Sequence, residues 1–228
     1  MMFIMLSGGV RREGVAKLKV QDFSVFDATY NIGMLHVYAG SKKWHYFTLL
    51  TPEATEAIQY YIKWRDTHGE HPVKPKAPLI REKFDDMMER RITPEELSPA
   101  SVSGTMSRLC RRAGIDDYTI SPDHSFRHFW DTMLINSNVN EKFKKYWMGL
   151  KKDLGMDIRY FDPKNPDTKV KMQEEFMKAV DLLTIEESNR LKKKLVEKDA
   201  VISENNVTIK TLMDDIQAQI KSLQQERR

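Results

Sequence analysis

The 228-residue sequence predicts an α+β fold: a mostly helical domain that contains a small three-stranded antiparallel sheet, followed by a long C-terminal helix. Three observations predict it. Short β-rich runs lie between Phe26 and Leu50, proline-marked helix starts recur after residue 50, and an apolar residue recurs every seventh position beyond Thr184. We therefore expect two domains, a body at residues 1–183 and a helical segment at residues 184–228.

The first residues predict the end of a buried helix. The run from Met1 to Leu6 is apolar and is followed by Gly8 and Gly9, and a helix commonly stops at a residue that tolerates positive φ. The run lacks the basic leader of a signal peptide. An apolar period then continues through Val15, Leu18 and Val20.

The sheet is predicted from alternation of apolar and polar residues. Three runs are separated by breaks at residues 31–33 (Asn-Ile-Gly) and 39–41 (Ala-Gly-Ser), which favour turns. The residues that mark the runs are Phe26, Tyr30, Met34, His36, Tyr38, Tyr46, Thr48 and Leu50.

Helices are predicted over residues 52–67, 100–113, 125–135 and 141–148. Thr51 before Pro52, and Ser98 before Pro99, place a side-chain acceptor ahead of a proline at the first turn. Residues 68–97 carry four prolines and are expected to form an irregular surface excursion.

Composition narrows the class of protein. A hydrophobic fraction of 40% and a charged fraction of 31% are typical of a soluble globular chain. The net charge of +4 permits nucleic-acid binding without requiring it. The one cysteine, Cys110, excludes an internal disulfide and suits a reducing compartment, and no apolar run approaches the roughly 18 residues of a membrane span.

The C-terminal segment has a heptad pattern. One position is apolar throughout, and its companion position is half polar and includes Asn205, which would select a register at a cost in stability. This pattern predicts a coiled coil that associates with itself, and the alternative is a single extended helix docked on the body. The first position holds Leu195, Ile202, Ile209, Ile216 and Leu223, and the companion position holds Leu191, Lys198, Asn205, Leu212 and Gln219.

Four short patterns contain residues that could carry chemistry. Arg11 follows a glycine turn and could present a fork of donors to a phosphate, and Lys42 lies in a turn between two strands. His124 and Arg127 are three apart on one predicted helix, so both can address the same group. Tyr160 stands beside an arginine with nothing local to mark it as a nucleophile. Taken singly, each pattern is also what an ordinary surface or packing residue looks like.

The sequence contains two further candidate binding features, a histidine pair and a basic helix face. His124 and His128 are four apart and could begin a zinc site, although the sequence shows no obvious third ligand. The helix over residues 100–113 bears a basic face that could contact phosphates, formed by Arg108, Arg111 and Arg112.

The order and spacing of these patterns resemble the catalytic domain of the tyrosine recombinase, or phage integrase, family. Gly9-Val10-Arg11 with Leu18 and Asp22 is similar to the family's first arginine box. Lys42 is similar to its hairpin lysine, with Lys43 as a less favoured choice, and residues 124–129 (His-Ser-Phe-Arg-His-Phe) are similar to its His-x-x-Arg box. Met148-Gly149 followed by Tyr160 is similar to the last box, most of all in archaeal and archaeal-virus members. The resemblance covers residues 7–183.

The resemblance implies roles for these residues. Arg11 and Arg127 would hold the phosphate, His124 would accept a proton or orient the phosphate, and Lys42 would protonate the leaving oxygen. Tyr160 would attack the DNA and form a covalent 3′-phosphotyrosine, with no metal, ATP or other cofactor. The partners implied are double-stranded DNA attachment sites, bound by a homo-tetramer in the cytoplasm of the host cell, with phosphate contacts from Lys43, Arg108, Arg111 and Arg112.

The sequence departs from the family pattern in two places. The histidine or tryptophan expected after Gly149 is replaced by Leu150-Lys151-Lys152, so that Lys151 or Lys152 is expected to take over its contact with the phosphate, or the contact is lost. The helix and the DNA-clamping domain usual before the first arginine box are missing, which suggests a truncated reading frame or a fragment. Two alternatives therefore stay open: a related topoisomerase that nicks and reseals one duplex, and a catalytically inactive DNA-binding relative.

Overall fold

The computed structural model describes residues 1–82, 95–115 and 121–186, together with Leu195, Lys198, Ile202, Asn205 and residues 208–210 and 212–213. For residues 123 and 156–160 the backbone alone is described. The chain divides into two units, Met1–Ile185 and Glu186–Arg228.

The first unit contains the predicted three-stranded antiparallel sheet. Its strands β1 (Phe23–Asp27), β2 (Ile32–Val37) and β3 (Tyr46–Leu50) lie in the order β1-β2-β3. The expected break at residues 31–33 is wrong in part, because Ile32 and Gly33 belong to β2. Gly33 is a packing glycine there: a Cβ atom would lie 2.5 Å from the hydroxyl of Thr55.

The N-terminal helix ends where the glycines predicted. Helix α1 (Met2–Gly8) is closed by Gly9, whose φ of 60° is left-handed and whose N–H donates to the carbonyl of Met5. Helix α2 (Arg12–Lys17) and the short 3-10 helix η1 (Val20–Asp22) follow and lead into β1. Ile4, Met5 and Val15 are fully buried in the first of two core clusters, between α1, α3, α4 and the sheet.

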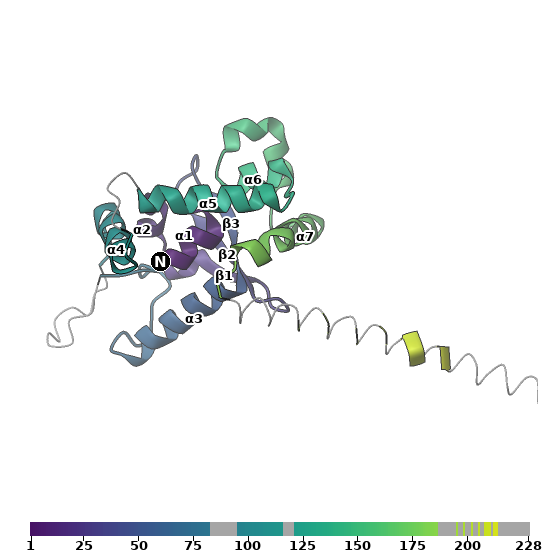
Figure 1. Cartoon of the computed structure of the whole chain (residues 1–228), viewed down its shortest axis with the longest axis horizontal. Helices are drawn as coiled ribbons and strands as arrows, with labels where there is room; N and C mark the ends of the chain where they lie inside the picture. Colours follow the sequence, from purple (N-terminus) through teal and green to yellow (C-terminus); the bar gives the residue numbers. More distant parts are fainter. Residues whose placement is uncertain are drawn as a thin grey trace, which may run out of the picture. The chain divides into compact units, whose positions relative to one another are not determined.

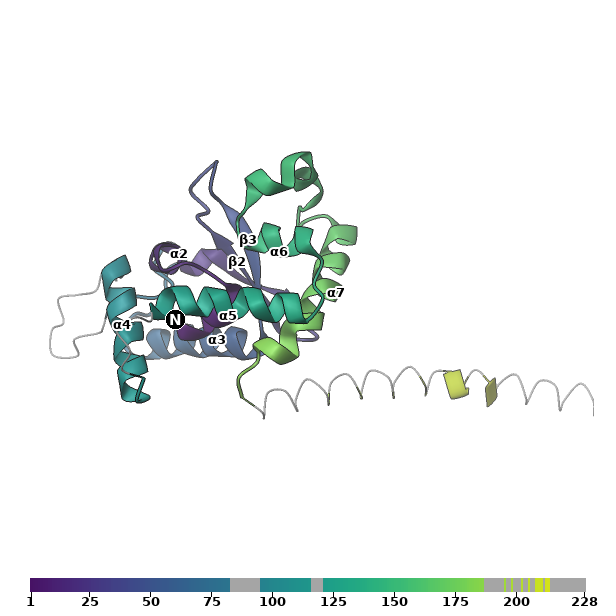
Figure 2. The same cartoon turned by 45° about the horizontal axis from the view of Figure 1, so that its top comes forward.

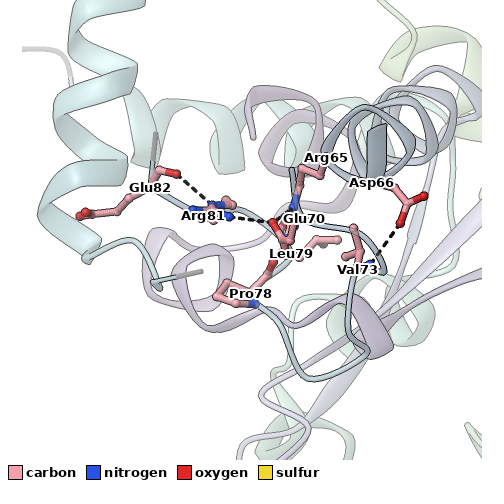
Figure 3. Close-up of polar contacts among 8 residues, drawn as sticks. All are labelled: Arg65, Asp66, Glu70, Val73, Pro78, Leu79, Arg81 and Glu82. Atoms are coloured by element: carbon pink, nitrogen blue, oxygen red, sulfur yellow. Dashed lines mark hydrogen bonds and ion pairs between the residues drawn. The ribbon is translucent and has the colours of Figure 1, made fainter. Parts of the chain in front are cut away.

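Helix α3 (Pro52–Thr67) starts and ends as expected, with the Thr51 hydroxyl accepting from the N–H of Ala54. Its end is fixed by a buried ion cluster in which Arg65 and Arg81 both bind Glu70 (Figure 3). Arg65 also donates to the carbonyls of Pro78 and Leu79. The described part of the 68–97 excursion is thereby fastened to α3.

The remaining helices are α4 (Pro99–Arg112), α5 (Pro122–Asn136), α6 (Glu141–Trp147) and α7 (Pro166–Leu183), with the 3-10 segment η2 (Lys151–Tyr160) between the last two. Helix α5 begins three residues earlier than expected, because Pro122 takes the first helical position. His124 therefore lies within the first turn of α5. Helices α4 and α6 match their expected ranges to within one residue at each end.

Contacts at the end of α1 determine where α5 lies. Helix α1 runs between α5 and α3 and against β3 (Figures 1 and 2). A Cβ atom on Gly9 would lie 2.6 Å from the ring of Trp130, and the Trp130 indole N–H donates to the carbonyl of Ser7 at 2.8 Å. The residues after Gly9 are thereby brought beside the first turns of α5.

In the second unit the described residues from Leu195 onward are helical and exposed. Leu195, Ile202 and Ile209 are 61%, 55% and 51% exposed, so these three members of the heptad position are uncovered in the single chain. Leu191, Ile216, Gln219 and Leu223 lie outside the described residues. Among the helices that are described, none has the length and apolar character needed to cross a membrane.

Candidate active site

A cavity of about 230 Å³ lies where the start of α2 meets the start of α5. Three of the predicted site residues, Arg11, His124 and Arg127, line it together. Arg12, Glu13 and Ser121 also line it. The fold thus brings the first arginine box and the His-x-x-Arg box to one place.

Arg127 is the most rigidly held of these side chains. It is only 6% exposed, and its two terminal nitrogens donate to the carbonyl of Gly9 at 2.6 Å and to the carbonyl of Met148 at 2.9 Å. Burial lowers the pKa of Arg127, and the charge of Arg11 lowers it further. Because a guanidinium has five N–H donors, donors remain for a ligand.

Arg11 presents its guanidinium differently. It occupies the N-cap position of α2 in an extended conformation, and its side chain is exposed. Its charge acts on Arg127, so two guanidinium groups of like charge share the cavity. Glu13 is the one carboxylate among the described lining residues, and it pairs with Arg12 at 2.9 Å. A cavity with this charge distribution favours an anion.

His124 faces the cavity from the first turn of α5 and pairs with a second histidine. Its Nε2 atom lies 2.9 Å from the Nε2 atom of His128, one turn further along the helix. One ring must donate to the other, so His128 influences which nitrogen of His124 carries a proton. Within the described parts of the chain no group of three His, Cys, Asp or Glu side chains could hold a metal ion, so the zinc alternative has no third ligand there.

The turn between β2 and β3 carries the predicted lysines. Lys42 and Lys43 are both exposed on it and lie outside the lining of the cavity. The base of the hairpin does reach the site. Burial raises the pKa of Tyr46 to about 12, and the nearby charge of Arg127 opposes that increase.

The segment after α6 meets the same hairpin. Gly149 has a φ of 73°, and a Cβ atom there would lie 2.7 Å from the Tyr46 ring. Lys151 is half-buried, and burial lowers its pKa, whereas Lys152 is exposed. The charge of Lys151 contributes to lowering the pKa of His45, after the effect of burial. Lys151 is thus near the hairpin base, and Lys152 faces solvent.

Tyr160 is the last residue of η2. Its side chain lies outside the described residues, so its assignment as the nucleophile stays a prediction. The basic residues of α4 are described: Arg108, Arg111 and Arg112 are exposed, and Arg108 donates to the Thr105 hydroxyl at 2.8 Å.

Sequence reasoning missed several residues at the site. Tyr46 interacts with the side chain of Arg127, and its ring lies against Gly149, but in the sequence it is an ordinary strand residue. Arg12 lines the cavity and also donates to Ser103 on α4. The motif spacing, which points to Arg11, gives no sign of either contact. His128 had a signal, its four-residue spacing from His124.

The chain is thus a mostly helical α+β domain in which two arginines and a histidine share one cavity. Residues 1–166 match the phage integrase family, and the chain belongs to that family. This confirms the resemblance inferred from the motifs, while the likeness to archaeal members stays a prediction.

Two solved structures have a similar fold. The integrase from mycobacterium phage Brujita is 16% identical with a TM-score of 0.51, over 83% of this chain and 54% of that chain. A XerA recombinase is 16% identical with a TM-score of 0.50, over 75% of this chain and 54% of that chain. The chain therefore spans about half the length of these proteins. No protein of curated function matches it.

Proposed function

We propose that this chain is the catalytic part of a site-specific DNA recombinase that cleaves and rejoins strands through a covalent 3′-phosphotyrosine, without metal or ATP. The observation that carries the proposal is the shared cavity of Arg11, His124 and Arg127. Membership of the phage integrase family supports it.

The proposed chemistry begins with in-line attack on a phosphodiester. The hydroxyl oxygen of Tyr160 forms a bond to phosphorus while the bond from phosphorus to the 5′ oxygen breaks. His124 takes the tyrosine proton, and Lys42 gives a proton to the 5′ oxygen. Rejoining is the reverse step, in which a 5′ hydroxyl displaces Tyr160. The phosphotyrosine conserves the bond energy, so no nucleotide is hydrolysed.

The arginines supply the electrostatic part of the catalysis. Attack places additional negative charge on the non-bridging oxygens, and fixed cationic donors are most effective there. Arg127 is held by two carbonyls before substrate arrives, so it needs little reorganisation. Arg11 is exposed and lines the same cavity, so it can contact the other oxygen.

The proposed partner is double-stranded DNA at an attachment site, bound by a homo-tetramer. The exposed Arg108, Arg111 and Arg112 on α4, with Lys43 on the hairpin, would contact phosphates. Lys151, being close to the hairpin base, is the stronger candidate for the contact normally made by the residue after Gly149, and Lys152 the weaker. The exposed heptad residues of the second unit would join copies of the chain.

Covalent capture tests the proposal. Because the attachment site is unknown, the chain is incubated with a pool of randomised duplexes that carry a nick, so that a cleaved strand diffuses away and traps the adduct. We expect a protein–DNA adduct on a denaturing gel, formed equally well with a metal chelator present. Sequencing the trapped strands would define the site.

Two tyrosine variants make the test specific. Tyr160→Phe should abolish the adduct, and Tyr60→Phe, which alters a tyrosine 72% exposed on α3, should not. An adduct that survives Tyr160→Phe would exclude Tyr160 as the nucleophile. DNA binding without any adduct would favour the inactive alternative, and relaxation of supercoils without recombinant products would favour the topoisomerase.

A further inference from the structure

Trp44 is an unusually placed tryptophan. It is 57% exposed on the turn between β2 and β3, whereas Trp130 and Trp147 are fully buried. Trp64, on α3, is 37% exposed and stacks on His68 with ring centroids 4.7 Å apart. In the described parts of the chain, the partner of the Trp44 ring is a cation, the Lys43 ammonium 4.8 Å from its centroid.

Hydrogen bonds hold the turn that carries Trp44. The Ser41 N–H donates to the carbonyl of Tyr38 at 2.8 Å, and the Ser41 hydroxyl accepts from the N–H of Trp44 at 3.1 Å. His45 is held across the hairpin by its 3.3 Å contact with His36. A side chain on such a turn loses less conformational entropy when it binds than one on an unstructured loop.

The base of the hairpin adjoins the candidate active site. The Tyr38 ring lies 6.2 Å from the Tyr46 ring, and a Cβ atom on Gly14 of α2 would lie 3.5 Å from the Tyr38 hydroxyl, which places the start of the turn beside the helix that begins at the cavity. The turn then projects from the end of the sheet (Figure 2). Its far end presents Lys42, Lys43 and Trp44, two cations and an aromatic ring, all exposed.

We propose that Trp44 is a base-stacking residue, which packs its indole against a nucleobase next to the phosphate held in the cavity. An exposed aromatic ring beside cations is the combination that binds unpaired bases, since every base has a π-face and its backbone is anionic. Strand exchange after cleavage would separate bases near the cleaved phosphate from their partners, and the exposed indole on the adjoining hairpin can stack on one of them. The inference rests on the proposed function and adds a residue that contacts the DNA.

Affinity for two DNAs tests the proposal. One is an intact mixed-sequence duplex, and the other is the same duplex with a central gap of unpaired adenines, both carrying an end label for anisotropy. We expect Trp44→Ala to weaken binding to the gapped duplex by about 10-fold, the effect of losing one stacked base. Its binding to the intact duplex should change by less than about twofold. Trp44→Phe, which keeps a ring, should recover most of the lost affinity.

Fluorescence gives a second measurement on the same full-length chain. Gapped DNA should quench the tryptophan emission of the wild-type chain. It should also quench the emission of Trp64→Phe, the control variant that removes the exposed tryptophan of α3 and keeps Trp44. It should leave the emission of Trp44→Phe unquenched. Equal thermal melting of the variants would show that the turn substitutions leave the fold intact.

Three outcomes would overturn the inference: unchanged affinity of Trp44→Ala for gapped DNA, an equal loss on both duplexes, or undiminished quenching in Trp44→Phe. An equal loss would indicate a contact with the duplex surface instead of a free base. Failure of the wild type to bind either DNA would instead contradict the proposed function, so the two failures are distinguishable.

Discussion

The guanidinium of Arg127 donates a 2.6 Å hydrogen bond to the carbonyl oxygen of Gly9, two residues before Arg11. A second bond from the same guanidinium reaches the carbonyl of Met148, just before Gly149. Arg127 therefore joins three segments that the family resemblance treats as separate boxes. It is a structural link as well as a phosphate ligand in the proposed chemistry.

Arg127→Lys should reduce both stability and cleavage. A lysine carries its donors on a single nitrogen and does not reproduce the fork by which two separate nitrogens of Arg127 bond the two carbonyls. Hydrogen bonds from charged groups each contribute about 1.5–3 kcal/mol. We expect the free energy of unfolding in urea to fall by about 2–3 kcal/mol. Adduct formation should fall by about 100-fold, the usual effect of removing one preorganised donor.

Arg11→Lys is the control for this variant. Arg11 is exposed and caps α2 without a side-chain hydrogen bond, so its substitution should lower adduct formation to a similar degree and leave the unfolding free energy nearly unchanged. Equal destabilisation by both variants would contradict the structural role given to Arg127.

Gly149→Ala should destabilise the chain more than Gly114→Ala. Both glycines have positive φ, 73° and 75°, so each substitution carries about 1–2 kcal/mol of backbone strain. At Gly149 a Cβ atom would also lie 2.7 Å from the Tyr46 ring, whereas nothing lies within 4 Å at Gly114. We expect an additional loss of about 1–3 kcal/mol for Gly149→Ala, measured by urea unfolding. Equal losses would mean that Tyr46 moves aside at little cost.

Glu70→Gln should unfold more readily at neutral pH. It removes the carboxylate that neutralises two buried arginines, and breaking such a cluster costs about 3–5 kcal/mol. Asp66→Asn should have a smaller effect, because the half-buried Asp66 side chain accepts from the Val73 N–H and an amide oxygen can still accept that bond (Figure 3). Urea unfolding at pH 7 measures both.

The effect of Glu70 should depend on pH in a defined direction. Burial by itself would raise the pKa of Glu70, but hydrogen bonds from Arg65 and Arg81 bring it below its ordinary value of about 4.5. The stabilisation by the ionised Glu70 carboxylate is therefore present above pH 4.5. It is lost as the pH falls through the lower pKa that Glu70 has in the folded state. The difference in unfolding free energy between wild type and Glu70→Gln should therefore narrow below pH 4.5. A difference that stays constant with pH would contradict the stabilising role given to the ionised Glu70 carboxylate.

Much of the fold was predictable because its signals are local. Gly9 ends α1 through its own φ, and Thr51 caps α3 through a bond three residues away. Gly33 shows where local reasoning fails. Its sequence context suggested a turn, but the reason for a glycine there is the Thr55 side chain on a different element.

The candidate site likewise combines residues that local sequence patterns indicate with residues that only tertiary contacts bring in. Arg11, His124 and Arg127 were recognisable from motif spacing, which a family resemblance supplies. Tyr46 and the carbonyls of Gly9 and Met148 were not, because each takes part through tertiary contacts with Arg127 that leave no trace in the neighbouring residues.

Replacing Arg108, Arg111 and Arg112 with glutamine should reduce the salt dependence of DNA binding. All three are exposed on α4, and each phosphate contact contributes about 0.9 to the slope of log affinity against log salt. We expect the slope to fall by about 2–3, with weaker binding to every sequence alike. Lys63→Gln, an exposed cation on α3, should leave the slope unchanged. An unchanged slope in the triple variant would place the DNA on another face.

Ile209→Ser should dissociate assemblies of the full-length chain. Ile209 is 51% exposed and belongs to the same heptad position as Leu195 and Ile202, so burial of this position needs a partner helix. Burying one such side chain contributes about 1.5–3 kcal/mol, and a two-stranded coil loses that contribution twice. Sedimentation velocity should show the variant at the monomer mass at concentrations where the wild type is larger. Lys210→Ser, one residue along and at an outward heptad position, should sediment like the wild type. A wild-type chain that sediments as a monomer throughout would exclude self-association and favour the single extended helix.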